Sequence, residues 1–155
     1  PENRLEDPIW KMSGHTDRGR DGCRVPIPWT KDAAGAHGFS NDKNLKIDQA
    51  WLPQSAGWGE SAADTQQGVA GSFFEMVKTA LAIRKAESGL GDGQMDWIEV
   101  SDDVIAFQRP GKFACYVNLG KSDAVIPYGS EVLLASSELI GEHIPTDTAV
   151  WLRLP

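Results

Sequence analysis

The stretch from Gly19 to Trp29 constrains the fold of this chain more than any other. It reads Gly-Arg-Asp-Gly-Cys-Arg-Val-Pro-Ile-Pro-Trp. Pro26 and Pro28 each remove a backbone donor and push the preceding residue towards an extended conformation, and Asp21-Gly22 is a turn pair. Neither a helix nor a central strand is therefore expected to run through the segment, and we predict a stiff loop.

The loop carries two guanidinium groups, on Arg20 and Arg24. A guanidinium is a planar fork of donors, which suits a carboxylate or a row of sugar hydroxyls. Trp29 offers an apolar face beside them. Two interpretations stay open at this point: a loop that binds a ligand, or a loop whose arginines hydrogen-bond backbone carbonyls while Trp29 packs in the core.

The segment resembles a known family. The pattern Arg20-Asp21-x-x-Arg24-x-Pro26, then Trp29, is similar to the region after the eighth barrel strand in α-glucosidases and oligo-1,6-glucosidases of glycoside hydrolase family 13, the α-amylase superfamily, and to its actinobacterial branch in particular. Family members usually have Met or Leu at the position of Ile27. The resemblance extends to nearly the full chain, through these stretches: Gly38-Phe39-Ser40, Trp51-Leu52-Pro53, Leu81-Ala82-Ile83-Arg84 and Tyr116-Val117-Asn118-Leu119-Gly120.

The resemblance implies an α/β fold followed by an all-β one. Residues 1–90 would be the C-terminal end of a (β/α)8 catalytic barrel, with residues 1–71 as the loop after the eighth strand and residues 72–90 as the eighth helix. Residues 91–155 would form an antiparallel β-sandwich, the C-terminal domain. Active sites of such barrels lie at the C-terminal ends of the strands and are built from the loops that follow them.

The resemblance also implies a function. Arg24 corresponds to the family arginine that pairs with an upstream aspartate and holds the terminal glucose, while Arg20 and Asp21 shape the loop and its mouth. Retaining hydrolysis needs two carboxyl groups about 5 to 5.5 Å apart. In the family these catalytic acids come from earlier strands, and no matching motif exists here, so no catalytic residue is expected in this chain and the chain alone is expected to be inactive.

The activity implied is that of an exo-acting retaining α-glucosidase on short α-glucosidic oligosaccharides of the maltose, isomaltose or sucrose type, without a cofactor. Two alternatives stay open. One is a non-catalytic carbohydrate-binding or spacer module, favoured by the β-rich half and by six tryptophans in 155 residues. The other is a transglycosylase of the same fold, such as a sucrose isomerase or trehalose synthase.

Charge and hydropathy exclude some partners. A formal net charge of −7 disfavours nucleic acid and anionic membrane surfaces, both of which attract clustered Lys and Arg. No apolar stretch approaches the roughly twenty residues of a membrane span. The chain opens with Pro1 rather than Met, so a targeting segment could precede it; without one, we expect a cytoplasmic protein.

Cysteine and histidine give no strong site. Cys23 and Cys115 are too few for a disulfide framework or a zinc site, and we expect both to be reduced. His15, Asp17, Asp21 and His37 are metal-ligand types without tight ligand spacing, so no metal is expected.

Regular structure is predicted from about residue 73 onward. Ser72 and Glu75 form a capping box before an apolar stripe at helical spacing, which predicts a packing helix over about 73–88. From Trp97 onward the period switches to two, and residues 104–109, Pro110-Gly111 and residues 113–119 predict a β-hairpin. Further short strands are expected at 124–126, 131–135 and 148–154, whereas residues 1–68 predict long loops with one short helical piece.

Overall fold

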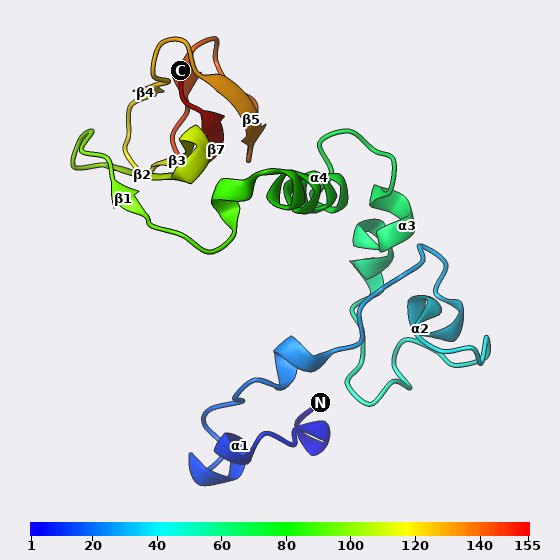
Figure 1. The fold of residues 1–155 in the computed structure, drawn as a ribbon. Helices are drawn as coiled ribbons and strands as arrows, with labels where there is room; N and C mark the ends of the chain where they lie inside the picture. Colours follow the sequence, from blue (N-terminus) through cyan, green and yellow to red (C-terminus); the bar gives the residue numbers. More distant parts are fainter. The chain divides into compact units, whose positions relative to one another are not determined.

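The computed structural model describes residues 1–155. The chain divides into two compact units, Pro1–Phe74 and Glu75–Pro155. Figure 1 shows that strands occur only in the second unit. No helix is long and apolar enough to cross a membrane.

The first unit contains short helices joined by irregular chain. They are α1 (Pro8–Met12), α2 (Ala34–Gly38), α3 (Ala63–Gln66) and the 3-10 helices η1 (Glu2–Arg4), η2 (Asp21–Arg24) and η3 (Ala56–Ser61). The predicted long loops are confirmed in that no strand forms, but there are several helical pieces rather than one. Helices of three to six residues are too short to leave a periodic signal in the sequence.

The first unit has little apolar core. Its buried apolar residues are small apart from one leucine: Ala36, Ala50, Leu52 and Ala62. Larger apolar side chains are exposed, among them Met12, Ile27, Trp29, Phe39 and Trp51. Polar side chains that donate to distant backbone carbonyl groups connect its segments instead. Arg4, for example, donates from Nη1 to the carbonyl oxygens of Asp48 and Ala50, at 3.1 and 2.6 Å.

Helix α4 (Phe73–Ala86) confirms the predicted helix and ends slightly earlier than expected, before the 3-10 helix η4 (Ser88–Leu90). Met76 and Ala80 line an apolar hollow of about 260 Å³ together with Leu134 and Trp151 of the sheet. Val77 and Leu81 line the same hollow, with exposed fractions of 38% and 61%, and Phe73 at the start of the helix is 69% exposed.

The second unit is built on a five-stranded antiparallel sheet in the order β1-β2-β3-β7-β5, with a two-stranded sheet of β4 and β6. The strands are β1 (Asp96–Trp97), β2 (Val104–Arg109), β3 (Phe113–Asn118), β4 (Ala124–Val125), β5 (Glu131–Ala135), β6 (His143–Ile144) and β7 (Thr148–Arg153). The predicted hairpin is β2 and β3, joined by the 3-10 helix η5 (Pro110–Lys112). The antiparallel β architecture is therefore confirmed, and its second layer is a small ribbon.

The core of the second unit lies on one face of the five-stranded sheet. Strand alternation places Ala114, Tyr116, Val150 and Leu152 on that face, because successive side chains of a strand point to opposite sides. Ile144 of the ribbon packs on them and is fully buried. The opposite face carries Trp151, against which helix α4 lies.

One polar cluster ties the end of the helical segment to the sheet. Arg153 of β7 pairs with Glu87, which follows α4, and with Glu131 of β5. The hydrogen bond from Arg153 to Glu87 and the charge of Glu131 raise the pKa of the guanidinium above its usual range. The arginine stays charged and joins three segments of the second unit.

Candidate functional site

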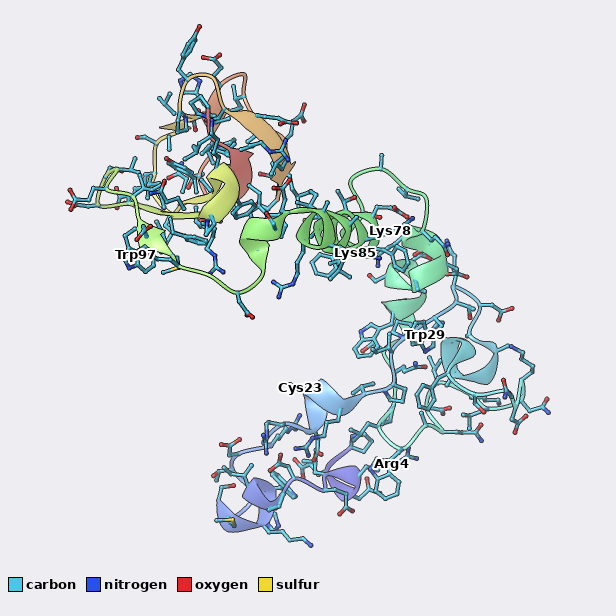
Figure 2. The ribbon with its side chains drawn as sticks, in the orientation of Figure 1. Arg4, Cys23, Trp29, Lys78, Lys85 and Trp97 are labelled. Carbon is cyan, nitrogen blue, oxygen red and sulfur yellow. The ribbon has the colours of Figure 1, made fainter.

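The loop from Gly19 to Trp29 contains one 3-10 turn and then extended chain. Helix η2 covers Asp21–Arg24, where the Asp-Gly pair favours a turn. Val25 is extended, with φ −67° and ψ 139°, as expected for the residue before Pro26. No strand runs through the segment, which can be followed from Cys23 to Trp29 in Figure 2.

Both terminal nitrogens of Arg24 face carboxylates from its own unit. Nη2 lies 3.3 Å from Oδ2 of Asp7, and Nη1 lies 3.5 Å from Oδ1 of Asp21. The carboxylates are buried, with residue exposures of 6% and 3%, whereas 47% of the Arg24 side chain is exposed. One side of the guanidinium is thus anchored, and the rest of the side chain is partly exposed.

Asp21 is held by the backbone of a segment far away in the sequence. Its Oδ2 accepts hydrogen bonds from the amides of Glu6 and Asp7, at 2.7 and 3.0 Å. A carboxylate that accepts two backbone N–H groups has a fixed orientation. Asp21 therefore sets the position of Arg24 from one side.

Asp7 is the member of this cluster that the sequence analysis missed. It caps helix α1 by accepting from the amide of Ile9 at 3.1 Å, and it accepts from the amide of Arg20 at 3.1 Å. Its Oδ2 also lies 3.6 Å from Nε of Arg20. The Asp7-Pro8 pair is a helix-start signal that could have located the cap, but no local signal predicts the contact with Arg24.

The hydrogen bonds from the amides of Arg20 and Ile9, together with the charges of Arg24 and Arg20, lower the pKa of Asp7 below its ordinary value against the opposing effect of burial. Asp7 is therefore ionised at neutral pH. It is the shared counter-ion of both arginines.

The structure brings the three predicted binding residues, Arg20, Asp21 and Arg24, into one cluster around Asp7. Their role in binding a substrate stays a prediction. A neighbouring hollow of about 290 Å³ includes Asp21 in its lining, with Arg18, Val25 and Leu52. The arginines of the loop pair with carboxylates and not with backbone carbonyls.

Trp29 is held by the segment labelled α2, whose central residues form a left-handed turn and not a regular α-helix. Gly35, Ala36 and His37 have φ values of 65°, 52° and 56°, a region that residues with a Cβ rarely adopt. The carbonyl oxygen of His37 accepts from the amides of Trp29 and Thr30, at 2.8 and 3.0 Å. The indole is 52% exposed, so the interpretation that Trp29 packs in the core is wrong.

The remaining metal-ligand types have local partners. His15 stacks against Trp10 with ring centroids 4.9 Å apart, and Nδ1 of His37 lies 3.0 Å from the carbonyl oxygen of Thr30. No group of three His, Cys, Asp or Glu side chains is arranged to hold a metal ion. Both cysteines are free.

The fold and the loop motif define a relative of the α-glucosidase-like proteins of glycoside hydrolase family 13, corresponding to their C-terminal portion. A probable α-glucosidase from Rhizobium meliloti (strain 1021) is 30% identical over 123 residues, which are 77% of this chain and 21% of the relative. The glucan 1,6-α-glucosidase of Streptococcus dysgalactiae subsp. equisimilis is 25% identical over 134 residues, 83% of this chain and 24% of the relative. No family model matches the chain.

Solved structures agree with this relationship. The α-glucosyl transfer enzyme XgtA is 27% identical with a TM-score of 0.70, covering 97% of this chain and 29% of that one. Two neighbours below 25% identity share the fold. A trehalulose synthase MutB mutant in complex with glucose has 17% identity and a TM-score of 0.73, over 99% of this chain and 32% of that one. The trehalose-6-phosphate hydrolase TreA of Bacillus licheniformis has 18% identity and a TM-score of 0.67, over 97% of this chain and 30% of that one.

The chain thus spans between 21% and 32% of the length of these relatives and neighbours. The resemblance to glycoside hydrolase family 13 is confirmed.

Proposed function

We propose that the chain is the C-terminal portion of an exo-acting retaining α-glucosidase that releases terminal glucose from short α-linked oligosaccharides. The observation that carries the proposal is the environment of the Arg24 guanidinium. Its guanidinium is fixed by two buried carboxylates and is half exposed on the other side. A rigid, half-exposed fork is suited to holding the hydroxyls of one sugar ring at the end of a glucan.

The catalytic carboxylates would lie upstream of this chain. Asp7 and Asp21 cannot take that role while both are hydrogen-bonded to backbone amides and paired with Arg24. Hydrolysis with retention needs one carboxylate free to attack the sugar and one free to exchange a proton. The chain alone would therefore be inactive, and the complete reaction would need no cofactor because carboxylates and water suffice.

The same proposal assigns residues 1–90 to the end of a (β/α)8 barrel and residues 91–155 to the C-terminal β domain. The antiparallel sheets of the second unit support the assignment of a β domain. A cytoplasmic location is part of the proposal, supported by two free cysteines.

The test is Arg24→Ala in the complete enzyme, with Arg24→Lys as the matched variant that keeps the charge but loses the fork. We expect kcat/KM on maltose and isomaltose to fall by about 100-fold or more in Arg24→Ala, with partial recovery in Arg24→Lys, because removal of the fork costs transition-state binding. Turnover within about threefold of wild type in Arg24→Ala would remove Arg24 from the site and refute the proposal.

A second candidate is an enzyme that transfers glucose instead of releasing it. Similarity to the α-glucosyl transfer enzyme XgtA favours this reading. Product analysis of the complete protein on sucrose and maltose separates the two, because hydrolysis releases free glucose and transfer yields new disaccharides or longer glucosides.

A further inference from the structure

The cluster around Arg24 is electrically balanced. Two guanidinium groups, on Arg20 and Arg24, face two carboxylates, on Asp7 and Asp21, at distances of 3.3 to 3.6 Å. The neighbouring Arg18 is balanced in the same way by Glu2, 3.6 Å away. The loop thus presents many N–H donors without an excess of positive charge.

The charge balance is a fixed part of the structure, because hydrogen bonds hold both carboxylates in place. Oδ1 of Asp7 caps helix α1 and its Oδ2 accepts from the amide of Arg20, while Oδ2 of Asp21 accepts from two amides. Both side chains are more than nine-tenths buried. The arginine side chains, by contrast, are exposed, by 79% for Arg20 and 47% for Arg24. A ligand would therefore contact N–H groups of arginines whose charge is already balanced by carboxylates.

A guanidinium without a counter-ion binds phosphate strongly, since both the charge and the two-pronged geometry match. A guanidinium already paired offers its remaining N–H groups to neutral acceptors and gains little from an anion. The fold alone does not decide between these cases, because the same fold occurs in an enzyme named as a trehalose-6-phosphate hydrolase.

We propose that Asp7 makes this site selective for uncharged sugars over anionic ones, as the buried counter-ion shared by Arg20 and Arg24. The proposal rests on the proposed function, in which Arg24 holds the terminal sugar. Asp7 acts through the arginines and is a specificity-determining positioning residue, not a catalytic one. Its ionised state at neutral pH, set by the surrounding N–H donors, is what the selectivity requires.

The experiment compares Asp7→Asn and Asp7→Ser with Asp17→Asn in the complete enzyme. Asn and Ser both cap helices well, so helix α1 keeps its cap while the charge is lost. Asp17 is an exposed aspartate whose Oδ1 accepts from the amide of Gly19, and it pairs with neither Arg20 nor Arg24. Asp17→Asn therefore changes the net charge by the same amount, two residues before the loop.

The measured quantity is the ratio of inhibition constants for glucose 6-phosphate and glucose 1-phosphate relative to glucose. We expect the ratio to fall at least about fivefold in both Asp7 variants and to stay at the wild-type value in Asp17→Asn, because a freed guanidinium attracts phosphate. The fall in the ratio should be smaller at 500 mM NaCl than at 50 mM NaCl, since salt screens exposed charges. KM for maltose should rise more than kcat falls.

An unchanged ratio in the Asp7 variants would overturn the proposal, and so would loss of folding in both, which would make Asp7 a structural residue. These failures differ from failure of the proposed function. Normal turnover in Arg24→Ala refutes the proposed function, whereas an impaired Arg24→Ala with an unchanged ratio in Asp7→Asn refutes only the selectivity role of Asp7. In the 155-residue chain itself, inorganic phosphate should shift the loop amide signals of Asp7→Asn in NMR spectra and leave those of Asp17→Asn in place.

Discussion

Asn118 is expected to be the most costly polar residue to remove from the second unit. Its Nδ2 donates to the carbonyl oxygens of Ser122 and Ile144, at 2.9 and 2.8 Å, and its Oδ1 accepts from the amide of Gly120 at 2.9 Å. The side chain is 1% exposed. It therefore joins the end of strand β3 to the following turn and to strand β6.

The cost of Asn118→Ala follows from those three bonds. Each neutral hydrogen bond contributes about 1 kcal/mol net, and each buried partner left unpaired costs about 1 to 3 kcal/mol. Some partners will find water after the truncation, so we expect a loss of about 3 kcal/mol in the free energy of unfolding. For a unit of this size that corresponds to a fall in Tm of about 10 °C or more.

The assay is urea unfolding followed by circular dichroism, with Gln108→Ala as the control. Gln108 is an exposed residue of strand β2 in the same sheet, and its truncation should cost less than about 0.5 kcal/mol. Asn118→Asp should be at least as costly as Asn118→Ala, because a buried carboxylate would face the carbonyl oxygens of Ser122 and Ile144. If Asn118→Ala unfolds like Gln108→Ala, the three bonds do not hold the sheet together as argued.

Three other predictions concern separate features. Gly59→Ala should lower Tm, since a Cβ there would lie 2.6 Å from a backbone carbonyl oxygen, whereas Gly57→Ala, with nothing within 4 Å, should not; equal melting curves would contradict this. The carboxyl of Asp7 should titrate below the ordinary Asp range in carbon-detected NMR; its depressed pKa means that it stabilises the fold at neutral pH and that this stability is lost as pH falls through its folded pKa. Iodoacetamide should label Cys23 rapidly and Cys115 slowly, because Cys23 is exposed while burial raises the pKa of Cys115; equal rates would refute the burial of Cys115.

The second unit was predictable because its signals are local. Alternation over residues 104–109 and 113–119 is visible without knowledge of any distant residue, and the turn at Pro110-Gly111 fixes the pairing of β2 with β3. Helix α4 likewise follows from the spacing of its apolar residues. What the sequence did not indicate is that the last strand, β7, inserts between β3 and β5, since strand order depends on packing between distant segments.

The left-handed turn at residues 35–37 was not predictable. Glycine at position 35 is compatible with positive φ, but Ala36 and His37 each carry a Cβ that disfavours it. The surrounding structure compensates, because the His37 carbonyl receives two amides and Ala36 donates to the carbonyl of Leu45 at 3.0 Å. Hydrogen bonds to other segments outweigh the local backbone preference of these residues. Strain of this kind persists only where the surrounding structure enforces it.

The loop motif was visible in the sequence, but the cause of its rigidity was not. Pro26 and Pro28 determine where regular structure cannot form, and they do not determine where the chain goes. That is set by Asp7 and Asp21, whose oxygens accept amides from across the loop and leave only a narrow range of positions for Arg24. Replacing one proline should therefore loosen the approach to Trp29, while replacing either buried carboxylate should displace the guanidinium itself. A loop that binds a ligand through one arginine depends more on the anions behind that arginine than on the stiffness of the chain that follows it.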